Sequence, residues 1–128
     1  MLLISISTEG QNVNPTTHQI TNWNMRLTFN YTYTYDLDLK QSTSEALRAT
    51  CIVVLEIGQD GTGRLITAIN GDKKVAPLYS CVQANNLFII DFHDSNNKAK
   101  FAYVSVANNV IQKFWLVNDE NVAIVFSN

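Results

Sequence analysis

Charged side chains are scarce in this 128-residue chain. Asp, Glu, Lys and Arg make up 16% of the residues, where a typical globular protein has about 25%. The polar surface must therefore consist mainly of uncharged groups, which asparagine, serine and threonine supply. The nine Lys and Arg residues are scattered and the net charge is −2, so we expect no nucleic-acid partner. The nearest approaches to a basic cluster, Lys73-Lys74 and Lys98 with Lys100, are expected to decorate turns.

Long apolar runs and a targeting signal are also missing. No apolar stretch approaches the roughly 18 residues of a membrane-spanning helix. The sequence MLLISISTEG has no basic start and no cleavage site, so it is not expected to be a signal peptide, and Leu2 to Ser7 are predicted to form a first strand. We therefore expect no membrane span, and a protein that is either cytoplasmic or the mature form of a secreted one.

The chain has only two cysteines, so at most one disulfide can form. Cys51 and Cys81 both lie inside apolar, strand-like runs, which is a common setting for a free buried thiol. We expect free thiols, and a disulfide is the alternative if the two strands are neighbours.

What the chain does have is a long stretch of strict alternation, WNMRLTFNYTYTYDLDLK at 23–40. Its odd positions are apolar or aromatic: Trp23, Met25, Leu27, Phe29, Tyr31, Tyr33, Tyr35, Leu37 and Leu39. Its even positions are all polar, and a period of two over this length predicts a half-buried β-strand in an all-β fold. A strand over 23–39 would span roughly 55 Å, so it must bend, and Asn30 is the candidate bend point.

The rest of the chain predicts a meander of shorter strands. Residues 8–21 are expected to form a long loop. Residues 40–50 are the one candidate for a short helical turn, with a longer helix through Leu55 as the alternative. Turns rich in Gly and Asn then separate strands at 51–57, 64–69, 75–84, 87–92, 100–107, 110–117 and 122–127. Strands joined by tight turns are antiparallel neighbours.

These elements predict a single β domain over residues 1–128. The expected fold is an antiparallel β-barrel, a lipocalin-like meander of about eight or nine strands, or a closely related β-sandwich, with at most one short helix near residues 43–50. The closed barrel is preferred because closure removes the exposed edges of a sheet. In size and meander the chain resembles lipocalin-like and avidin-like barrels, but Thr21-Asn22-Trp23 stands where their first barrel strand has Gly-x-Trp.

Alternation is weaker in the later strands. Leu87-Phe88-Ile89-Ile90 and residues 111–117 are apolar on both faces, as in strands that face a second layer or a protein partner. Together with the low charge, this pattern makes homo-oligomerisation by sheet packing a hypothesis.

The candidate ligand-binding residues are Phe29, Tyr31, Tyr33 and Tyr35, on one face of the long strand. Tyrosine combines an aromatic body with a hydroxyl group, so the ladder can form a ligand platform inside a barrel. The alternative is a core-facing strand whose tyrosine hydroxyls reach the rim.

No catalytic residue, metal site or cofactor is predicted. Asp91, His93 and Asp94 cluster at a strand end, but their spacing matches no metal motif, and turn formation accounts for Asp94. The segment GQDGTG at 58–63 is followed by a strand rather than a helix, so we expect a hairpin and not a phosphate loop.

Three hypotheses describe the function. The first is a non-enzymatic binding domain that holds a small, partly apolar ligand inside a β-barrel. The second is a module for carbohydrate recognition, adhesion or protein interaction, whose ligand would be a glycan or a protein. The third, and the less favoured class, is a small barrel isomerase or cyclase with His93 and Asp91 at the mouth.

Overall fold

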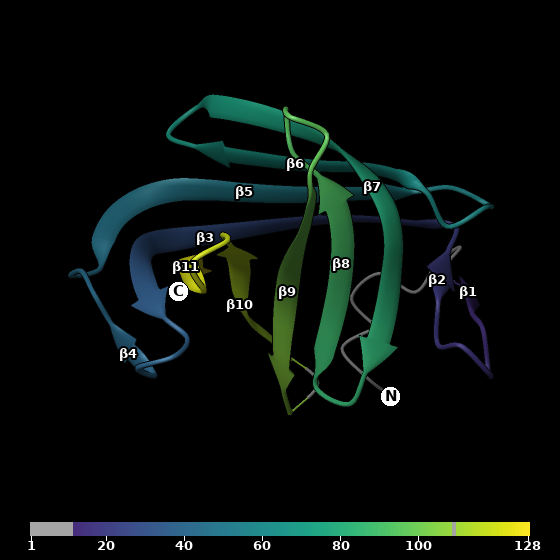
Figure 1. The fold of residues 1–128 in the computed structure, drawn as a ribbon, viewed down its shortest axis with the longest axis horizontal. Coiled ribbons are helices and arrows are strands. Elements are labelled where there is room, and N and C mark those ends of the chain that lie inside the picture. Colours follow the sequence, from purple (N-terminus) through teal and green to yellow (C-terminus); the bar gives the residue numbers. More distant parts are fainter. Residues whose placement is uncertain (1–11, 109) are drawn as a thin grey trace.

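A computed structural model describes residues 12–108 and 110–128 (Figure 1). These residues form eleven strands and no helix. The strands are β1 (Asn12–Val13), β2 (Ile20–Thr21), β3 (Trp23–Asp36), β4 (Gln41–Ser42), β5 (Leu47–Ile57), β6 (Gly63–Ile69), β7 (Asp72–Ala84), β8 (Leu87–His93), β9 (Ala99–Ala107), β10 (Val110–Val117) and β11 (Val122–Ser127). The strand predicted at Leu2–Ser7 lies outside the described residues. Among the residues that the structure describes, no helix is long and apolar enough to cross a membrane.

Eight of the described strands close into an antiparallel barrel. β3 pairs with β5, each strand from β5 to β10 pairs with the next one along the chain, and β11 pairs back with β3. This seam runs from Val122 opposite Asp36 to Ser127 opposite Tyr31. The predicted barrel is therefore confirmed, and the arrangement is the closed meander rather than the sandwich. The short strand β4 is added to the end of β3, outside the closed cycle.

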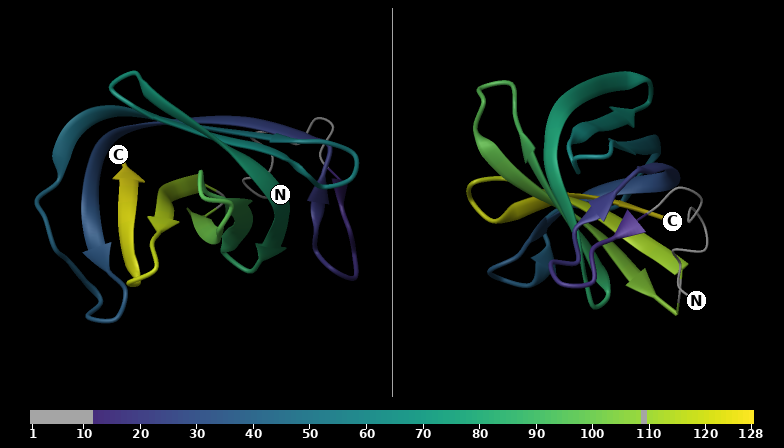
Figure 2. Two further views of the ribbon diagram at one scale, coloured as in Figure 1. Left: turned by 45° about the horizontal axis from the view of Figure 1, so that its top comes forward. Right: turned by 90° about the vertical axis from the view of Figure 1, so that its right-hand side faces the viewer.

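The barrel wall curves sharply along its long strands. Figures 1 and 2 show β3, β5 and β7 bending, so that each contributes to two parts of the wall. The pairing of β3 with β5 shifts in register between Phe29 and Tyr31, which is the predicted bend point around Asn30. Two steps along β3, from Phe29 to Tyr31, face three along β5, from Cys51 to Arg48, so the extra residue lies on β5. A bulge of this kind increases the local twist. The prediction that the long strand bends at Asn30 is confirmed.

The long strand ends earlier than the alternation predicts, at Asp36 instead of residue 39. The Asp36 carboxylate accepts hydrogen bonds of 2.9 Å from the backbone N–H groups of Asp38 and Leu39. This side-chain turn competes with the strand ladder and redirects the chain, although the apolar alternation continues.

No helical turn forms within residues 40–50, where the sequence allows for one. β5 begins at Leu47, which pairs with Thr32 of β3. Gln41 and Ser42 also pair with β3, as does Arg48, so strand pairing at both ends of this segment overrides the local capping signal.

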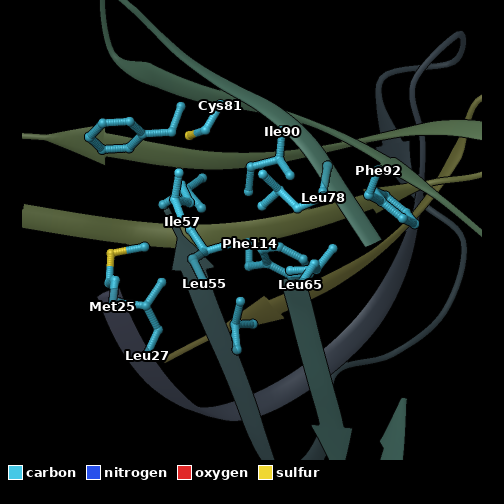
Figure 3. Close-up of a cluster of buried hydrophobic side chains, with 14 of the residues drawn as sticks. Met25, Leu27, Leu55, Ile57, Leu65, Leu78, Cys81, Ile90, Phe92 and Phe114 are labelled. Atoms are coloured by element: carbon cyan, nitrogen blue, oxygen red, sulfur yellow. The ribbon is translucent and has the colours of Figure 1, made fainter. Parts of the chain in front are cut away.

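The end of the barrel where β3 begins is packed with side chains. Trp23 and Phe88 lie there with ring centroids 5.1 Å apart. Figure 3 shows further members of this buried cluster converging from several strands. Ile20 of β2 is fully buried in the same cluster, and β2 lies against β7. The described part of the predicted loop 8–21 thus covers this end of the barrel.

Both cysteines are buried and free, as predicted. Cys51 lies on β5 and Cys81 on β7, and β6 separates these strands, so the condition for a disulfide is not met. Burial raises the pKa of the Cys81 thiol to about 12.

Asparagine shapes many of the turns. Positive φ angles occur at Asn22, Asn70, Asn85, Asn97, Asn108 and Asn121. Asparagine tolerates the left-handed region better than most residues, and tight hairpins need that conformation. The abundance of asparagine in the sequence is therefore partly a requirement of the turns.

Candidate ligand-binding cavity

The opposite end of the barrel holds a cavity of about 770 Å³. It lies where β3 ends and where the β6–β7, β8–β9 and β10–β11 turns are found. Its lining comes from strands around the barrel and from two of these turns: Thr34, Leu65, Thr67, Lys74, Val75, Ala76, Phe92, Asp94, Ser95, Lys100, Leu116, Val117, Asn118, Val122 and Ile124. Small-molecule sites typically measure about 300–1,000 Å³, so the volume is that of a ligand site.

The floor and much of the wall of the cavity are apolar. Leu65 and Phe92 belong both to the lining and to the buried cluster, so the cavity rests on the packed core. Higher on the wall, Ile124 pairs with Thr34 across the seam, and both face the cavity. Ile124 nevertheless keeps 39% of its surface exposed. A large aliphatic side chain exposed inside a barrel is a surface that an apolar ligand can cover.

A cluster of ion pairs holds the rim between the β8–β9 and β10–β11 turns. Lys100 Nζ lies 2.6 Å from Asp119 Oδ1 and 4.0 Å from Asp94 Oδ2, and Lys98 Nζ lies 2.6 Å from Asp119 Oδ2. The hydrogen bonds from Lys100 and Lys98 lower the pKa of Asp119 to about 2. The backbone N–H of Lys98 is the main cause that lowers the pKa of Asp94. Two lysines and two aspartates therefore compensate one another at this rim.

Lys74 is the other cation of the lining. It pairs with Thr67 across β6 and β7, and both residues face the cavity. Among the residues that the structure describes, its ammonium group has no hydrogen bond or ion pair. The adjacent Lys73 pairs with Ala68, and strand alternation places these two side chains on the outer face.

The bulge divides the four predicted ligand-binding residues. Phe29 is buried in the core. Beyond the bulge the alternation is reversed, because Thr34 lines the cavity and its neighbours Tyr33 and Tyr35 therefore point to the outer face, as does Tyr31. The expectation that the tyrosines line the barrel interior is wrong. A ligand-binding role for them on the outer face stays a prediction.

The tyrosines contribute to an aromatic cluster on the outer wall. Trp115 packs edge-on against Tyr35, with ring centroids 5.3 Å apart. The Lys113 ammonium donates a 2.8 Å hydrogen bond to the Tyr33 hydroxyl and lies 5.8 Å from the Trp115 ring centroid. Val125 pairs with both Tyr33 and Trp115 and is fully buried. The cluster therefore covers apolar surface on the outside of the seam.

The structure does not bring Asp91, His93 and Asp94 into one site. Phe92 faces the cavity, so alternation places Asp91 and His93 on the outer face, whereas Asp94 lines the mouth. The His93 ring packs against Tyr79, with centroids 4.0 Å apart. The isomerase hypothesis, which needs His93 and Asp91 at the mouth, gains no support from this arrangement. The described chain also holds no group of three or more His, Cys, Asp or Glu residues suited to a metal ion.

Sequence reasoning missed the polar residues of the cavity. Thr34 lies on the face that the alternation marks as outer, and Lys74 resembles turn decoration. One signal was available: the Asn-Gly pair at 70–71 predicts a two-residue turn, which places Thr67 opposite Lys74. That register would have shown the two polar side chains sharing one face.

No family model matches this chain, and neither a curated protein nor a solved structure shows significant similarity to it. The functional inference therefore rests on the geometry of the cavity and its rim.

Proposed function

We propose that this protein is a non-enzymatic binding domain that holds a small, partly apolar ligand in the open half of its barrel. The observation that carries the proposal is the cavity of about 770 Å³ at one end of a barrel whose other end is packed with side chains. An eight-stranded barrel is just wide enough to be filled by side chains or to hold one small ligand. Holding a ligand in this way would resemble the use of lipocalin-like barrels.

The chemistry of the lining supports a ligand with two different ends. Eight of the fifteen lining residues are apolar, and those on the floor belong to the core. The charged groups, Lys74, Asp94 and Lys100, lie near the strand ends at the mouth. Ligand sites commonly combine apolar walls with a few polar groups that fix orientation. The apolar part of the ligand would therefore point inward and its polar part toward solvent.

Filling the cavity tests this proposal directly. We expect Ala76→Trp, on the cavity wall, to weaken binding of the apolar fluorophore 8-anilinonaphthalene-1-sulfonate by about tenfold or more, since the indole would occupy the space of the probe. Ala68→Trp is the matched control, because Ala68 lies on the neighbouring strand and on the outer face. Circular dichroism would establish that both variants fold. Equal probe affinity in the two variants would count against a ligand site in the barrel. Native mass spectrometry of the purified protein is a second, independent test, since it would detect a co-purified ligand.

A second candidate function is carbohydrate recognition or adhesion on the outer wall. The cluster of Tyr33, Tyr35 and Trp115 supports it, because partly exposed aromatic rings offer apolar faces with polar groups at their edges. Glycan-array binding that is lost in Trp115→Ala, while cavity probes still bind, would favour this candidate. Unchanged glycan signals in that variant would remove it.

Self-association is the third interaction that the surface supports. Leu87, Phe101 and Val110 are 36%, 48% and 52% exposed on β8, β9 and β10. Exposed apolar side chains on a sheet favour packing against another sheet. Light scattering of the purified protein tests this, and a monodisperse monomer at working concentration would exclude it.

A further inference from the structure

We propose that the cavity ligand is an amphipathic anion, with an apolar body inside the barrel and a carboxylate bound by Lys74 at the mouth. The inference rests on the proposed binding function and deepens it by naming the charge of the ligand. The proposal is carried by Lys74, which has no ion-pair partner among the described residues and lies beside an apolar wall on the same strand.

The charges around the mouth are not equally available. Lys98 and Lys100 share Asp119 at 2.6 Å, and Lys100 also faces Asp94 at 4.0 Å. That rim cluster is neutral as a whole. Lys74 forms no such contact with any residue that the structure describes, and the charged residues of the lining, Lys74, Lys100 and Asp94, sum to +1. Asp72, two positions before Lys74 on β7, is exposed outside the lining.

Lys74 lies where the head group of a ligand that extends along β7 would be. Ala76 follows Lys74 on the same face of the strand, and residues two apart on a strand are separated by about 7 Å. Ala76 pairs with Leu65, which belongs to the cavity floor. An aliphatic chain against Ala76 and Leu65 would thus place its polar end beside the ammonium group of Lys74, with the Thr67 hydroxyl as its neighbour.

An anion gains most from this arrangement. A carboxylate can accept a charge-assisted hydrogen bond from the ammonium group. A cationic head group would be repelled by Lys74, and the acidic side chains of the rim cluster, Asp94 and Asp119, are already engaged by Lys98 and Lys100. A neutral head group would gain no ionic contact.

Isothermal titration calorimetry with three probes of equal chain length tests the proposal: dodecanoate, dodecanol and dodecylammonium. Because Lys74 is exposed to solvent, we expect dodecanoate to bind about three- to fivefold more tightly than dodecanol at low salt. We expect dodecylammonium to bind most weakly. Added salt should reduce the affinity for dodecanoate and leave that for dodecanol nearly unchanged.

Two lysine variants separate a cavity contact from general surface charge. Lys74→Met should remove the preference for dodecanoate over dodecanol, whereas Lys73→Met, which removes the neighbouring charge on the outer face, should keep it. Equal binding of dodecanoate and dodecanol to the wild-type protein, or equal loss in both variants, would overturn the inference and leave the binding function standing. Absence of binding by all three probes would overturn both proposals.

Discussion

The backbone N–H of Asn30 donates a 3.0 Å hydrogen bond to Oδ1 of Asn128, which lies 98 positions further along the chain. Asn30 stands at the bulge where β3 bends and its alternation reverses. The preceding Ser127 pairs with Tyr31 at the end of the seam. Asn128 therefore satisfies a backbone donor that the irregular pairing leaves free, and it fixes the bend from the far end of the sequence.

Removing this acceptor should destabilise the barrel. We expect Asn128→Ala to lower the free energy of unfolding by about 1 kcal/mol, the typical net contribution of one hydrogen bond. Asn128→Asp keeps an acceptor oxygen and should retain most of that stability. Urea denaturation measures both variants, and indistinguishable midpoints for the alanine and aspartate variants would show that the bond contributes nothing.

Gly63 is required by a close approach of two strands. It pairs with Ile57 at the end of β5, and a Cβ atom added there would overlap the carbonyl oxygen of Glu56. We expect Gly63→Ala to destabilise the protein by about 3 kcal/mol, because the backbone itself would have to move. In the same hairpin, Gly58 has ordinary van der Waals space, so Gly58→Ala should stay within about 0.5 kcal/mol of wild type. Thermal unfolding of the two variants side by side makes the comparison, and equal effects would contradict it.

The two thiols should be unreactive in the folded protein. Cys51 and Cys81 are buried, and burial raises the pKa of both thiols, that of Cys81 from 9.0 to about 12. The thiolate is the reactive form, so little of it is present at pH 8. We expect Ellman's reagent to label both cysteines in urea but neither in buffer within the same time. Rapid labelling of one thiol in buffer would reveal local opening of its strand.

Asp119 should stabilise the fold in a pH-dependent way. Its pKa is lowered from 3.8 to about 2, mainly by hydrogen bonds from Lys100 and Lys98, so folding favours the ionised form. That contribution is fully present above pH 3.8 and is lost as the pH falls through about 2. Asp119→Asn should therefore lower the Tm at pH 7 in low salt, and the difference should shrink below pH 3.8 and vanish once the pH is below about 2.

Glu120→Gln is the control for the pH experiment. Glu120 is adjacent and exposed, and it forms no ion pair with the residues that the structure places. Its replacement should leave the Tm nearly unchanged across the same pH range. A Tm difference for the Asp119 variant that persists undiminished at pH 2 would mean that Asp119 acts through something other than its charge.

The first half of β3 shows what alternation predicts well. Trp23, Met25, Leu27 and Phe29 are all 9% exposed or less, because burial of one face determines the register of a strand. The hairpins after β5 were also predictable, since their turns have the Asn and Gly residues that positive φ angles require. The residues within each strand or turn were therefore enough to predict the first half of β3 and these hairpins.

The second half of β3 shows why the cavity could not be predicted in the same way. The register shift near Asn30 depends on how β5 pairs with β3 and on where Asn128 is placed, and these contacts join distant parts of the sequence. One shift exchanges the inner and outer faces, so Thr34 takes the place inside the barrel that Tyr33 was expected to occupy. The rim ion pairs depend likewise on turns brought together by closure.

The pairing of β11 with β3 also has a kinetic consequence. Every other strand pair of the barrel joins strands that are near in sequence, with only the short β4 between β3 and β5, but the seam joins residues 31–36 to residues 122–127. Its formation must overcome the entropy of closing a loop that contains nearly the whole meander. Folding rates fall as contacts become more distant in sequence, so seam closure is expected to be the slow step. Until it occurs, two open strand edges are exposed, and the nascent barrel is most liable to pair with another copy of itself.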